Sequence, residues 1–435
     1  MESIILKNGR IIDWEKEEIV RADVRIENQI IMEIGSELAS DGVTVIDVEG
    51  RLISHGLIDL HVHLREPGFE AKETIESGTM SAARGGFTAV ACMPNTRPVT
   101  DCPEVIEAIL QQTEKKGAVR VYPLAAISKN ELGRELTNME ALQEAGAIAF
   151  SDDGVGVQSS HMMKEAMRMA SRLGLPVVAH CEDNTLAHGG CVHEGTFSAK
   201  YGLKGIPNTA ESVHVGRDIL LAEDTGVHYH VCHISAKESV RLVREAKARG
   251  QKVTAEVTPH HLLLSDEDIP EPSAQYKMNP PLRAPEDRAA VLEGLKDGTI
   301  DVIVTDHAPH TVEEKAQSMS LAPFGIVGLE TAFPLLYTHL VERGELSLLQ
   351  LIDCMTRKPA ELFSLGDGQC RVGAIADLTV IDLEEEREID PEQFLSKGRN
   401  TPFTGWKVKG WPVMTMVDGK VVWQEEGWNR GGEQA

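Results

Sequence analysis

Residues 59–68 read Asp59-Leu60-His61-Val62-His63-Leu64-Arg65-Glu66-Pro67-Gly68. The apolar run over 57–62 predicts a short β-strand, and because side chains alternate along a strand, His61 and His63 point to the same face. Two imidazoles on a rigid strand supply half of a zinc site. Arg65 follows where the strand ends, and its planar, permanently charged group could hold a carboxylate beside the metal. An isolated His-x-His pair can also be two structural histidines, so the rest of the chain has to decide.

The composition is that of a globular protein with an acidic charge balance. The chain has 435 residues, 42% of them hydrophobic, and its 43 basic and 68 acidic residues give a net charge of −25. This length suits a large α/β domain together with a smaller one. Because no basic run is dense enough to follow a phosphate backbone, the sequence argues against nucleic acid as a partner.

Neither a signal peptide nor a membrane helix is expected. The first residues lack a basic segment followed by a long apolar run, and no stretch reaches the roughly 18 apolar residues that a membrane helix needs. The seven cysteines include no Cys-x-x-Cys pair and are expected to be reduced thiols. These features predict a cytoplasmic protein without a membrane partner.

Both ends of the chain have the pattern of small antiparallel sheets. Residues 1–52 alternate apolar and polar, with the turn pair Asn8-Gly9 between two such runs, and strand patterns return over 363–435. Neither end is long enough to build a good core alone. We therefore expect 1–52 and 363–435 to pack together as one small β-sandwich domain.

The middle of the chain, residues 53–362, alternates short β-branched runs with helical stretches. Strands are predicted near 57–62, 87–92, 118–124, 146–151, 176–180, 228–232, 252–257 and 300–305, and helices over 73–84, 104–116, 159–173, 210–225, 236–249 and 286–297. Eight parallel strands with intervening helices predict an α/β fold, a closed (β/α)8 TIM-type barrel. An open doubly wound sheet is the alternative, but no Gly-x-Gly-x-x-Gly follows any strand.

Polar residues able to bind a metal recur at the C-terminal ends of five predicted strands. They are His61 and His63 on the first strand, Asp152 and Asp153 on the fourth, His180 on the fifth, His233 on the sixth and Asp306 on the eighth. The carboxyl ends of barrel strands meet at one rim, where barrel enzymes build their active sites. A lone histidine there is more often structural, but four histidines and two carboxylates in the same position predict a metal centre.

Other polar residues near these strands are expected to have no ligand role. Strand alternation turns Cys181 and Cys232 to the opposite face, where they would pack in the core. His55 lies about 20 Å from the histidine pair along an extended strand. His260 and His261, at the end of the seventh strand, are expected to be structural or to support the ligands.

Seven motifs carry a family resemblance: HVHLREPG (61–68), MPNT (93–96), FSDDG (150–154), AHCE (179–182), CHIS (232–235), KMNPP (277–281) and TDHAPH (305–310). Together they resemble the amidohydrolase superfamily and, within it, the bacterial class I dihydroorotases. The similarity runs along nearly the whole chain, with the motifs in the same order.

The resemblance implies two zinc ions per subunit. His61, His63 and Asp306 would hold one zinc and His180 and His233 the second, with Asp153 and a hydroxide bridging the two. The residues agree, since three ligands per metal leave open positions for water, as catalytic zinc requires.

Strand parity favours Asp153 over Asp152 as the bridge, because Ile148 and Phe150 share the parity of Asp152 and suit the face toward the helices. Related hydantoinases carry a carboxylated lysine at this point. This chain has aspartates there, and its nearest lysine, Lys164, falls in the following helix.

The resemblance further implies a reaction, the reversible hydrolysis of L-dihydroorotate to N-carbamoyl-L-aspartate in de novo pyrimidine (UMP) biosynthesis. The bridging hydroxide would attack the ring carbonyl, which the zinc polarises. Asp306, as catalytic residue, would take the proton and pass it to the leaving ring nitrogen.

An anionic substrate needs local cations in a chain of net charge −25. By the family pattern the substrate would be bound by His63, Arg65, Asn95, Asn279 and His310 and by the backbone of Phe324 and Gly325. Arg65 would hold the carboxylate, with Asn95 and His310 around it. Asn95 and Asn279 lie beside prolines, so a turn-forming role is the alternative for both.

Residues 309–328 form a long connection that we expect to cover the site and to order with substrate. Two other functions stay open: another cyclic amidohydrolase, an allantoinase or hydantoinase, and a silent structural subunit of a pyrimidine-pathway assembly. By family, a homodimer is expected, and association with aspartate transcarbamoylase stays open.

Overall fold

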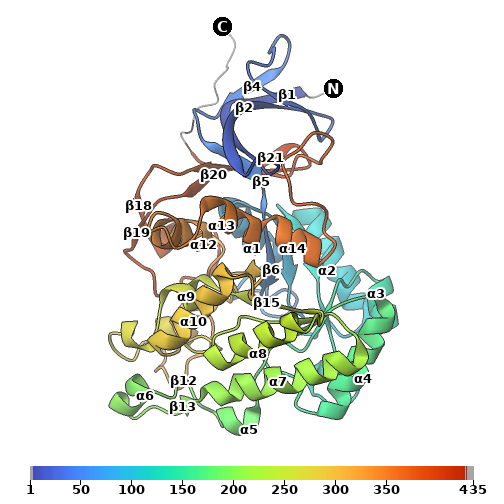
Figure 1. The fold of residues 1–435 in the computed structure, drawn as a ribbon, viewed down its shortest axis with the longest axis vertical. Coiled ribbons are helices and arrows are strands. Elements are labelled where there is room, and N and C mark those ends of the chain that lie inside the picture. The colour runs from blue at the N-terminus through green and yellow to red at the C-terminus, as the bar shows by residue number, and fades with distance from the viewer. Residues whose placement is uncertain (1–2, 427, 429–435) are drawn as a thin grey trace.

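The computed structural model describes residues 3–426 and 428. Figure 1 shows two parts: a large barrel of strands and helices, and above it a β-rich domain to which both ends of the chain contribute. Within the described residues, no helix combines the length and the apolar character that crossing a membrane requires.

Parallel strands form the inner wall of the barrel. They are β6 (Leu57–Val62), β7 (Phe87–Cys92), β8 (Arg120–Pro123), β9 (Ala125–Ala126), β10 (Phe150–Ser151), β11 (Val177–Ala179), β14 (Tyr229–Val231), β15 (Val253–Val257) and β16 (Val302–Ile303). One sheet joins β6, β7 and β8, and the other runs from β9 through β10, β11, β14 and β15 to β16.

Both seams between the two sheets are bonded, so the barrel is closed. Leu124 alone separates β8 from β9, and its N–H donates to the carbonyl of Cys92 at 3.0 Å. At the other seam, Val62 bridges His307 and the N–H of His63 donates to the His307 carbonyl at 2.9 Å. The predicted TIM-type barrel is therefore confirmed, and the open doubly wound sheet is excluded.

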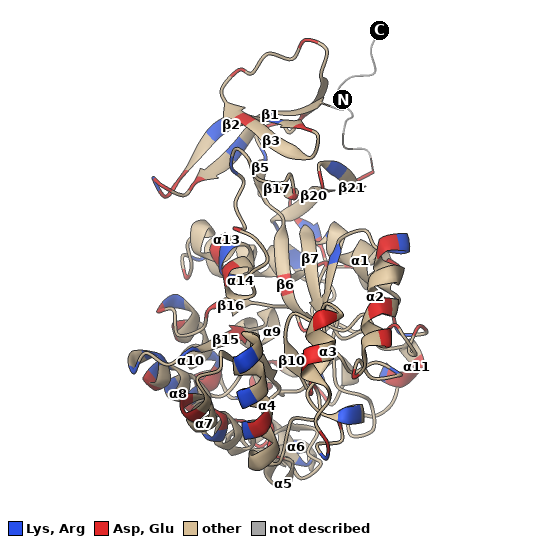
Figure 2. Cartoon of the chain, turned by 90° about the vertical axis from the view of Figure 1, so that its right-hand side faces the viewer, with Lys and Arg blue, Asp and Glu red and all other residues tan. Residues whose placement is uncertain are grey.

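Helices cover the outside of this wall: α1 (Ile75–Arg84), α2 (Pro103–Lys116), α3 (Met139–Glu144), α4 (Ser160–Leu173), α7 (Asn208–Thr225), α8 (Lys237–Ala248), α10 (Pro285–Lys296), α13 (Leu348–Met355) and α14 (Arg357–Leu362). Local sequence sets their ends. Thr74 and Ser77 form a capping box at the start of α1, and Gly174 ends α4 at a φ of 70°, a conformation that favours glycine. Residues of both charge signs occur along the outer helices, as the colours in Figure 2 show for α4, α7 and α8.

Shorter elements fill the connections. They are η1 (Lys129–Glu131), α5 (Asn184–Ala187), β12 (Val192–His193), α6 (Thr196–Tyr201), β13 (Gly205–Ile206), α9 (Pro259–Leu263), η2 (Asp266–Asp268), η3 (Ala274–Tyr276), α11 (Val312–Lys315), α12 (Ala332–Leu336), η4 (Tyr337–Val341), β18 (Arg387–Glu388), η5 (Pro391–Gln393) and β19 (Lys407–Val408).

Strand alternation divides the barrel's apolar residues between two cores. Val178 belongs to the inner core, which fills the barrel, whereas Val177 and Ala179 belong to the core under the helices. Phe363, just after α14, closes the inner core and is 7% exposed. The inside of the barrel is thus packed rather than hollow.

The β-rich domain is one eight-stranded sheet built from both chain ends. Its strands are β1 (Ser3–Asp13), β2 (Glu18–Glu27), β3 (Ile30–Gly35), β4 (Thr44–Asp47), β5 (Leu52–His55), β17 (Leu378–Asp382), β20 (Trp411–Val417) and β21 (Lys420–Gln424). β5 joins the two ends by pairing with β1 and with β17. The sheet curves around its own apolar core. The two ends were expected to form one β-sandwich: their union in one β-rich domain is confirmed, and its eight strands belong to a single curved sheet. The exact boundaries at 52/53 and 362/363 stay predictions.

Candidate metal centre and substrate pocket

Six side chains from five strands meet at the carboxyl end of the barrel. We call them the metal cluster: His61, His63, Asp153, His180, His233 and Asp306. The Asp306 Oδ1 atom lies 3.0 Å from Nε2 of His63 and 3.5 Å from Nε2 of His61. Asp153 Oδ1 lies 3.4 Å from Nε2 of His61 and 3.7 Å from Nδ1 of His180. All six side chains are buried, so the structure brings together every residue predicted to be a ligand.

The cluster divides into two groups that could each hold a metal ion. One consists of His61, His63 and Asp306, the other of Asp153, His180 and His233, and within each group the ligand atoms lie within 4.8 Å of one another. Asp153 Oδ2 also lies 3.5 Å from Nε2 of His63. Its carboxylate therefore faces both groups.

The chemistry of the donor set fits a cation. Among the described residues, His61 Nε2, Asp153 Oδ1 and His233 Nδ1 are buried without a hydrogen-bond partner. Burial lowers the pKa of His61, but Glu256, Asp153 and Asp306 outweigh it and raise that pKa well above its usual value. Positive charge is thus favoured among these atoms, and a metal ion would supply it while satisfying them.

Both aspartates of the cluster are ionised at neutral pH. Burial raises the pKa of Asp306, but the neighbouring His61 and His63 bring it down to about 2. The same balance places the pKa of Asp153 well below its usual range. Burial together with the charges of His180 and His61 lowers the pKa of His233 to about 4, which leaves its ring neutral and able to bind a metal.

The backbone turns sharply where the strands end. Arg65, His233 and Asp306 have φ angles of 63°, 27° and 49°, in the left-handed region that side chains other than glycine seldom adopt. These turns direct the three side chains to the mouth of the barrel. Strained backbone of this kind is concentrated at functional sites.

The aspartate pair divides as strand parity suggested. Asp153 lies in the metal cluster, whereas the Asp152 carboxylate accepts hydrogen bonds from the N–H of Ser128, at 3.0 Å, and from its hydroxyl. The expectation for Cys232 is wrong: its side chain faces the barrel interior and its Sγ lies within 4.8 Å of ligand atoms of His61 and Asp153. The alternation that points His230 inward also points Cys232 inward, and the turn at His233 then breaks it.

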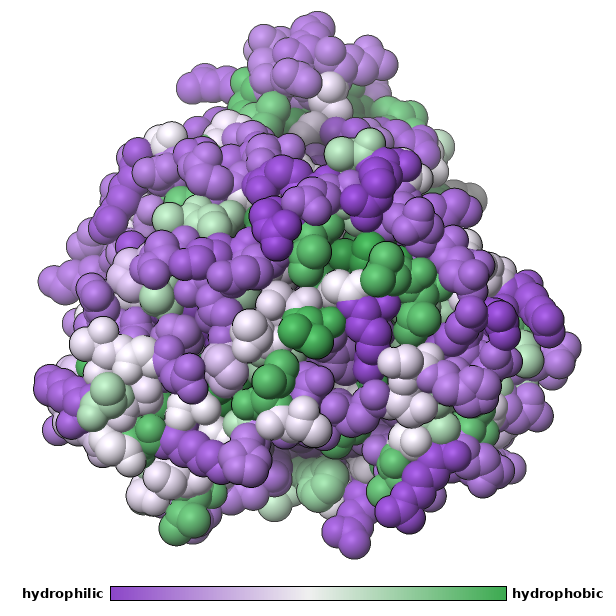
Figure 3. All heavy atoms as spheres, turned by 60° about the horizontal axis from the view of Figure 1, so that its bottom comes forward, coloured by the Kyte–Doolittle hydropathy of each residue, from purple (hydrophilic) through white to green (hydrophobic). Residues whose placement is uncertain are grey.

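A pocket of about 200 Å³ opens over the cluster. All residues predicted to bind substrate line it: His63, Arg65, Asn95, Asn279, His310, Phe324 and Gly325. The carboxyl ends of the strands point away from the β-rich domain, toward α5 and α6 (Figure 1). Figure 3 brings that face forward and shows apolar side chains gathered near its middle, among hydrophilic ones.

Arg65 is the cation of this pocket. Burial lowers its pKa to about 10, so it stays charged at neutral pH. Its Nε donates to the carbonyl of Pro309 at 3.2 Å. His310 is kept neutral, because burial and the charge of Arg65 lower its pKa to about 3, and its Nε2 donates to the carbonyl of Phe324 at 2.7 Å.

The two asparagines already have protein partners. The side-chain oxygen of Asn95 accepts a hydrogen bond from Nδ1 of His63 at 2.9 Å, which leaves Nε2 of that ring free to face Asp306. Asn279 donates to the carboxylate of Glu182 at 3.0 Å. Asn95 thus orients a residue of the metal cluster, a role that its motif alone did not indicate.

Two buried lysines hold the segment 309–328 over the pocket. Lys315 Nζ donates to the carbonyls of Lys277, Pro323 and Gly325 at 3.2, 3.1 and 2.9 Å. Lys277 Nζ donates to the carbonyl of Ala322 at 2.5 Å and lies 4.5 Å from the centre of the Phe324 ring. The segment covers one side of the pocket; that it orders with substrate stays a prediction.

Glu256, a fully buried residue of β15, was not predicted from the sequence. Its Oε1 accepts from Nδ1 of His61 at 2.6 Å and from the N–H of His233 at 3.1 Å, and its Oε2 accepts from Nε2 of His230 at 3.0 Å. Burial raises its pKa, but His61 and His230 outweigh this and keep it ionised. The sequence did contain a signal for this residue, because a carboxylate within a strand of otherwise apolar pattern is seldom buried without a partner.

Three other residues that were expected to have no ligand role have their partners outside the cluster. Lys164 pairs with Asp224 at 2.7 Å on the helical layer. His55 lies in β5, and its Nδ1 is 2.7 Å from the Gly56 carbonyl. His261 is tied to Thr258 and to the Pro280 carbonyl.

The chain matches known proteins along most of its length. The model of the family described as "Dihydro-orotase-like" matches residues 50–239, and the model described as "Amidohydrolase family" matches residues 276–423. The dihydroorotase of Geobacillus sp. (strain WCH70) is 63% identical over 425 residues, covering 97% of this chain and 99% of the relative. That of Halalkalibacterium halodurans is 61% identical, covering 97% and 98%.

Among solved structures, the L-hydantoinase (dihydropyrimidinase) of Arthrobacter aurescens has a TM-score of 0.86 at 29% identity and covers 97% of this chain and 96% of its own. The D-hydantoinase (dihydropyrimidinase) of Thermus sp. has a TM-score of 0.81 at 29% identity, covering 96% and 94%. The barrel with its β-rich domain is thus shared with cyclic-amide hydrolases. At about 60% identity over almost the full length, this chain belongs to the dihydroorotase family of the amidohydrolases.

Proposed function

We propose that this enzyme catalyses the reversible hydrolysis of L-dihydroorotate to N-carbamoyl-L-aspartate in de novo pyrimidine (UMP) biosynthesis. One observation carries the proposal: a single pocket contains two groups of metal-binding side chains and a buried, permanently charged arginine, Arg65. The substrate combines a cyclic amide to be opened with a carboxylate to be held. The dihydroorotases at 61–63% identity support the same activity.

His61, His63 and Asp306 would hold one metal ion and His180 and His233 a second, with Asp153 between them. We propose zinc, because imidazole nitrogen and carboxylate oxygen are ligands that zinc accepts. A metal bound there supplies a Lewis acid and activates water at neutral pH.

Arg65 would bind the substrate carboxylate through its guanidinium, close to the His310 ring. Because His310 is neutral, it adds no second full charge beside Arg65. Its hydrogen bond to the Phe324 carbonyl fixes the backbone that would face the substrate ring. Asn279 and the backbone of Gly325 would meet the amide edge of the substrate. Asn95 would act chiefly by orienting His63.

Asp306 would carry the proton. Its low pKa means that its carboxylate is free to accept a proton from the attacking water. It would then return that proton to the leaving ring nitrogen, so that one carboxylate acts first as base and then as acid.

The test is turnover of L-dihydroorotate by the purified protein, assayed beside allantoin and hydantoin, with metal content measured on the same sample. We expect turnover of dihydroorotate alone, and its loss in Asp306→Ala or after chelation. Asp224→Asn, which alters a surface ion pair with Lys164, is the matched control and should remain active. A metal-loaded protein without activity on dihydroorotate would overturn the substrate assignment.

A hydantoinase is the second candidate, because the hydantoinase structures share the whole fold. The pocket residues argue against it. Aspartates stand at the end of β10, and Lys164 lies away from the cluster, while Arg65 has no evident role toward a ring without a carboxylate. A silent subunit is disfavoured because all six residues of the metal cluster are present and converge.

We propose further that the enzyme works in the cytosol, since its seven cysteines are all free thiols. A homodimer and an association with aspartate transcarbamoylase are proposals from the family resemblance. Sedimentation of the purified chain, alone and mixed with that enzyme, tests both.

A further inference from the structure

A chain of hydrogen bonds runs from the metal cluster into the barrel. Nδ1 of His61 bonds Glu256, whose other oxygen bonds Nε2 of His230 at 3.0 Å. Nδ1 of His230 lies 2.7 Å from the hydroxyl of Thr254, and that hydroxyl lies 2.7 Å from Nε2 of His228. His61, Glu256 and His230 are fully buried, and only Thr254 and His228 are partly exposed.

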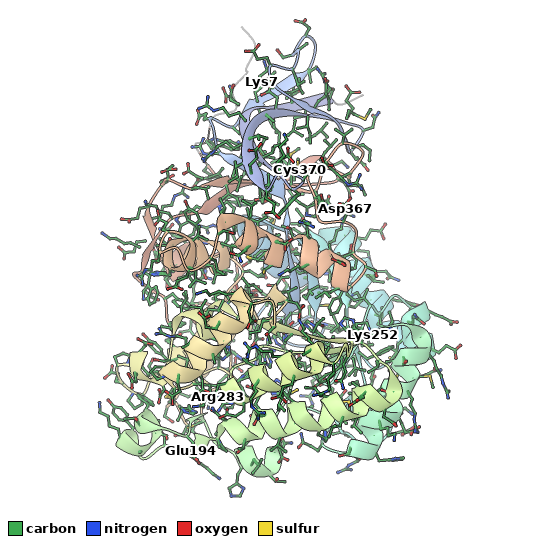
Figure 4. All side chains as sticks on the ribbon, viewed as in Figure 1. Lys7, Glu194, Lys252, Arg283, Asp367 and Cys370 are labelled. Atoms are coloured by element: carbon green, nitrogen blue, oxygen red, sulfur yellow. The ribbon has the colours of Figure 1, made fainter. Side chains whose placement is uncertain are left out.

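The fold makes this chain possible. β14 and β15 are parallel neighbours in which His230 pairs with Thr254. Residues two apart on a strand share a face, so His228 and His230 face Thr254 and Glu256 across the pair. The edge of His230 packs against Phe363, with the rings 5.4 Å apart and at 89°. The hydrogen-bond chain ends at His228. On the neighbouring strand His228 lies opposite Lys252, which immediately precedes β15 and is labelled in Figure 4.

With one proton on each ring, the donors and acceptors leave one arrangement. The Glu256 carboxylate accepts from Nδ1 of His61 and from Nε2 of His230. Nδ1 of His230 then has a lone pair, so the Thr254 hydroxyl donates to it. The oxygen of that hydroxyl accepts from Nε2 of His228. Every bond therefore polarises the next toward Glu256.

We propose that His230, Thr254 and His228 are positioning residues that fix Glu256 and, through it, the tautomer and orientation of His61. With its proton held on Nδ1, His61 presents the lone pair of Nε2 to the metal cluster. The inference rests on the proposed function only in taking His61 as a metal ligand. It assigns a role in the reaction to residues near the far end of the barrel, which touch neither metal nor substrate.

The hydroxyl of Thr254 is the link that can be removed with least disturbance. Thr254→Val keeps the branched shape that suits a strand, and Thr254→Ser keeps the hydroxyl as the matched control. Partners of metal-binding histidines typically contribute about 10–100-fold in metal affinity. We expect Thr254→Val to weaken zinc binding, measured by competition with a chelator, on the order of tenfold, with kcat for dihydroorotate reduced and KM unchanged. Thr254→Ser should restore both.

Histidine-ring NMR on ¹⁵N-histidine-labelled protein gives a readout that does not depend on activity. In the wild type, His230, identified by the loss of its signals in His230→Gln, should carry its proton on Nε2. In Thr254→Val the ¹⁵N signal of His230 Nδ1 should shift, because this atom loses its hydrogen bond to the hydroxyl, and in Thr254→Ser it should keep its wild-type position. Zinc affinity within twofold of wild type in Thr254→Val, or an equal loss in Thr254→Ser, would overturn the proposal.

A second pair of variants decides the matter if Thr254→Val fails to fold. His228→Gln keeps an N–H at the outer end of the chain, whereas His228→Leu removes it. We expect weaker zinc binding in His228→Leu but not in His228→Gln. Equal zinc affinities of the two variants would overturn the proposed hydrogen-bond chain. If the zinc effects appear but the wild type does not turn over dihydroorotate, the proposed function fails while this inference stands.

Discussion

Two buried polar clusters lie near the carboxyl end of the barrel, and they differ in how their atoms are satisfied. The first is the metal cluster, which retains three unpartnered polar atoms among the described residues. The second, here the Glu73 cluster, consists of Glu73, Ser77, His307 and Ser396. Glu73 accepts from Nε2 of His307 at 3.2 Å, from the N–H of Lys397 at 3.2 Å and from both hydroxyls.

In the Glu73 cluster, the carboxylate and the histidine ring both have hydrogen-bond partners for their polar atoms. Nδ1 of His307 accepts from the N–H of Gly328 at 3.2 Å, so both ring nitrogens are used. Burial raises the pKa of Glu73, but the bonds from His307 and the hydroxyls lower it further, and the carboxylate stays ionised. Buried carboxylates and histidines thus produce a structural anchor in one place and, we propose, a ligand site in the other.

The largest expected effect is on catalysis in the metal cluster. Asp306→Asn removes the carboxylate proposed as base and acid, and general acid–base catalysis contributes up to about 10⁴-fold. We expect kcat to fall by about that factor. The apoprotein should also lose some stability at neutral pH, because His61 and His63 favour the charged carboxylate and lower its pKa. Steady-state kinetics measures kcat, and calorimetry measures the unfolding temperature of the apoprotein. A fully active variant would contradict the role of Asp306.

Metal removal should come next in size. A ligand that binds only the folded state stabilises it by about 4 kcal/mol at a concentration 1,000 times its dissociation constant. We expect added zinc to raise the melting temperature of the wild-type apoprotein in a concentration-dependent way. The increase should disappear in His61→Ala combined with His180→Ala. An unchanged melting temperature with saturating zinc would mean that the cluster holds no metal.

The Glu73 cluster should respond in stability instead. Glu73→Gln replaces an ionised acceptor of four hydrogen bonds with a group that must also donate, and breaking a buried network of this kind costs about 3 kcal/mol. Urea unfolding measures the loss. Glu76→Gln is the matched control and should cost little, because Glu76 lies in the first turn of α1, exposed and paired with Lys116. Zinc binding by folded Glu73→Gln should match wild type; loss of the metal would show that the two clusters are not separate.

The smallest expected effect is on the pH dependence of stability and concerns Lys315. Its Nζ donates to three carbonyls, but burial disfavours its charged form. Burial and the nearby Lys277 lower the pKa of Lys315 to about 7. Between pH 7 and its ordinary value near 10.5, the unfolded chain binds the proton and the folded protein does not. Unfolding free energy therefore rises with pH in this window, by at most about 1.4 kcal/mol per pH unit for one group.

We expect the stability difference between wild type and Lys315→Met to grow in favour of wild type from pH 7 to pH 9. Below pH 7 it should be constant, because both states are then protonated. Urea unfolding at four pH values measures the slope. A difference independent of pH would place the pKa of Lys315 outside this window.

The comparison also shows how far the sequence analysis reached. His61, His63, His180 and Asp306 were found because each lies at or just after the end of a recognisable strand, and strand ends of a barrel meet at one rim. Glu256, His230 and the Glu73 cluster were missed. Their partners lie up to hundreds of residues away along the chain, as for Glu73 and Ser396, so no local pattern marks them. Cys232 was placed on the wrong face by the assumption that alternation holds through the strand end, where His233 departs from it.

The amino-acid sequence by itself determined the alternation of strands and helices, the β-rich chain ends and the rim on which the chemistry collects. These depend on side-chain periodicity and on residues near one another along the chain, which local physics dictates. Only the tertiary structure decided which polar atoms are satisfied. Whether a buried carboxylate anchors the fold or remains open to a metal depends on donors that distant segments bring to within about 3 Å, and that proximity exists only once the barrel has closed.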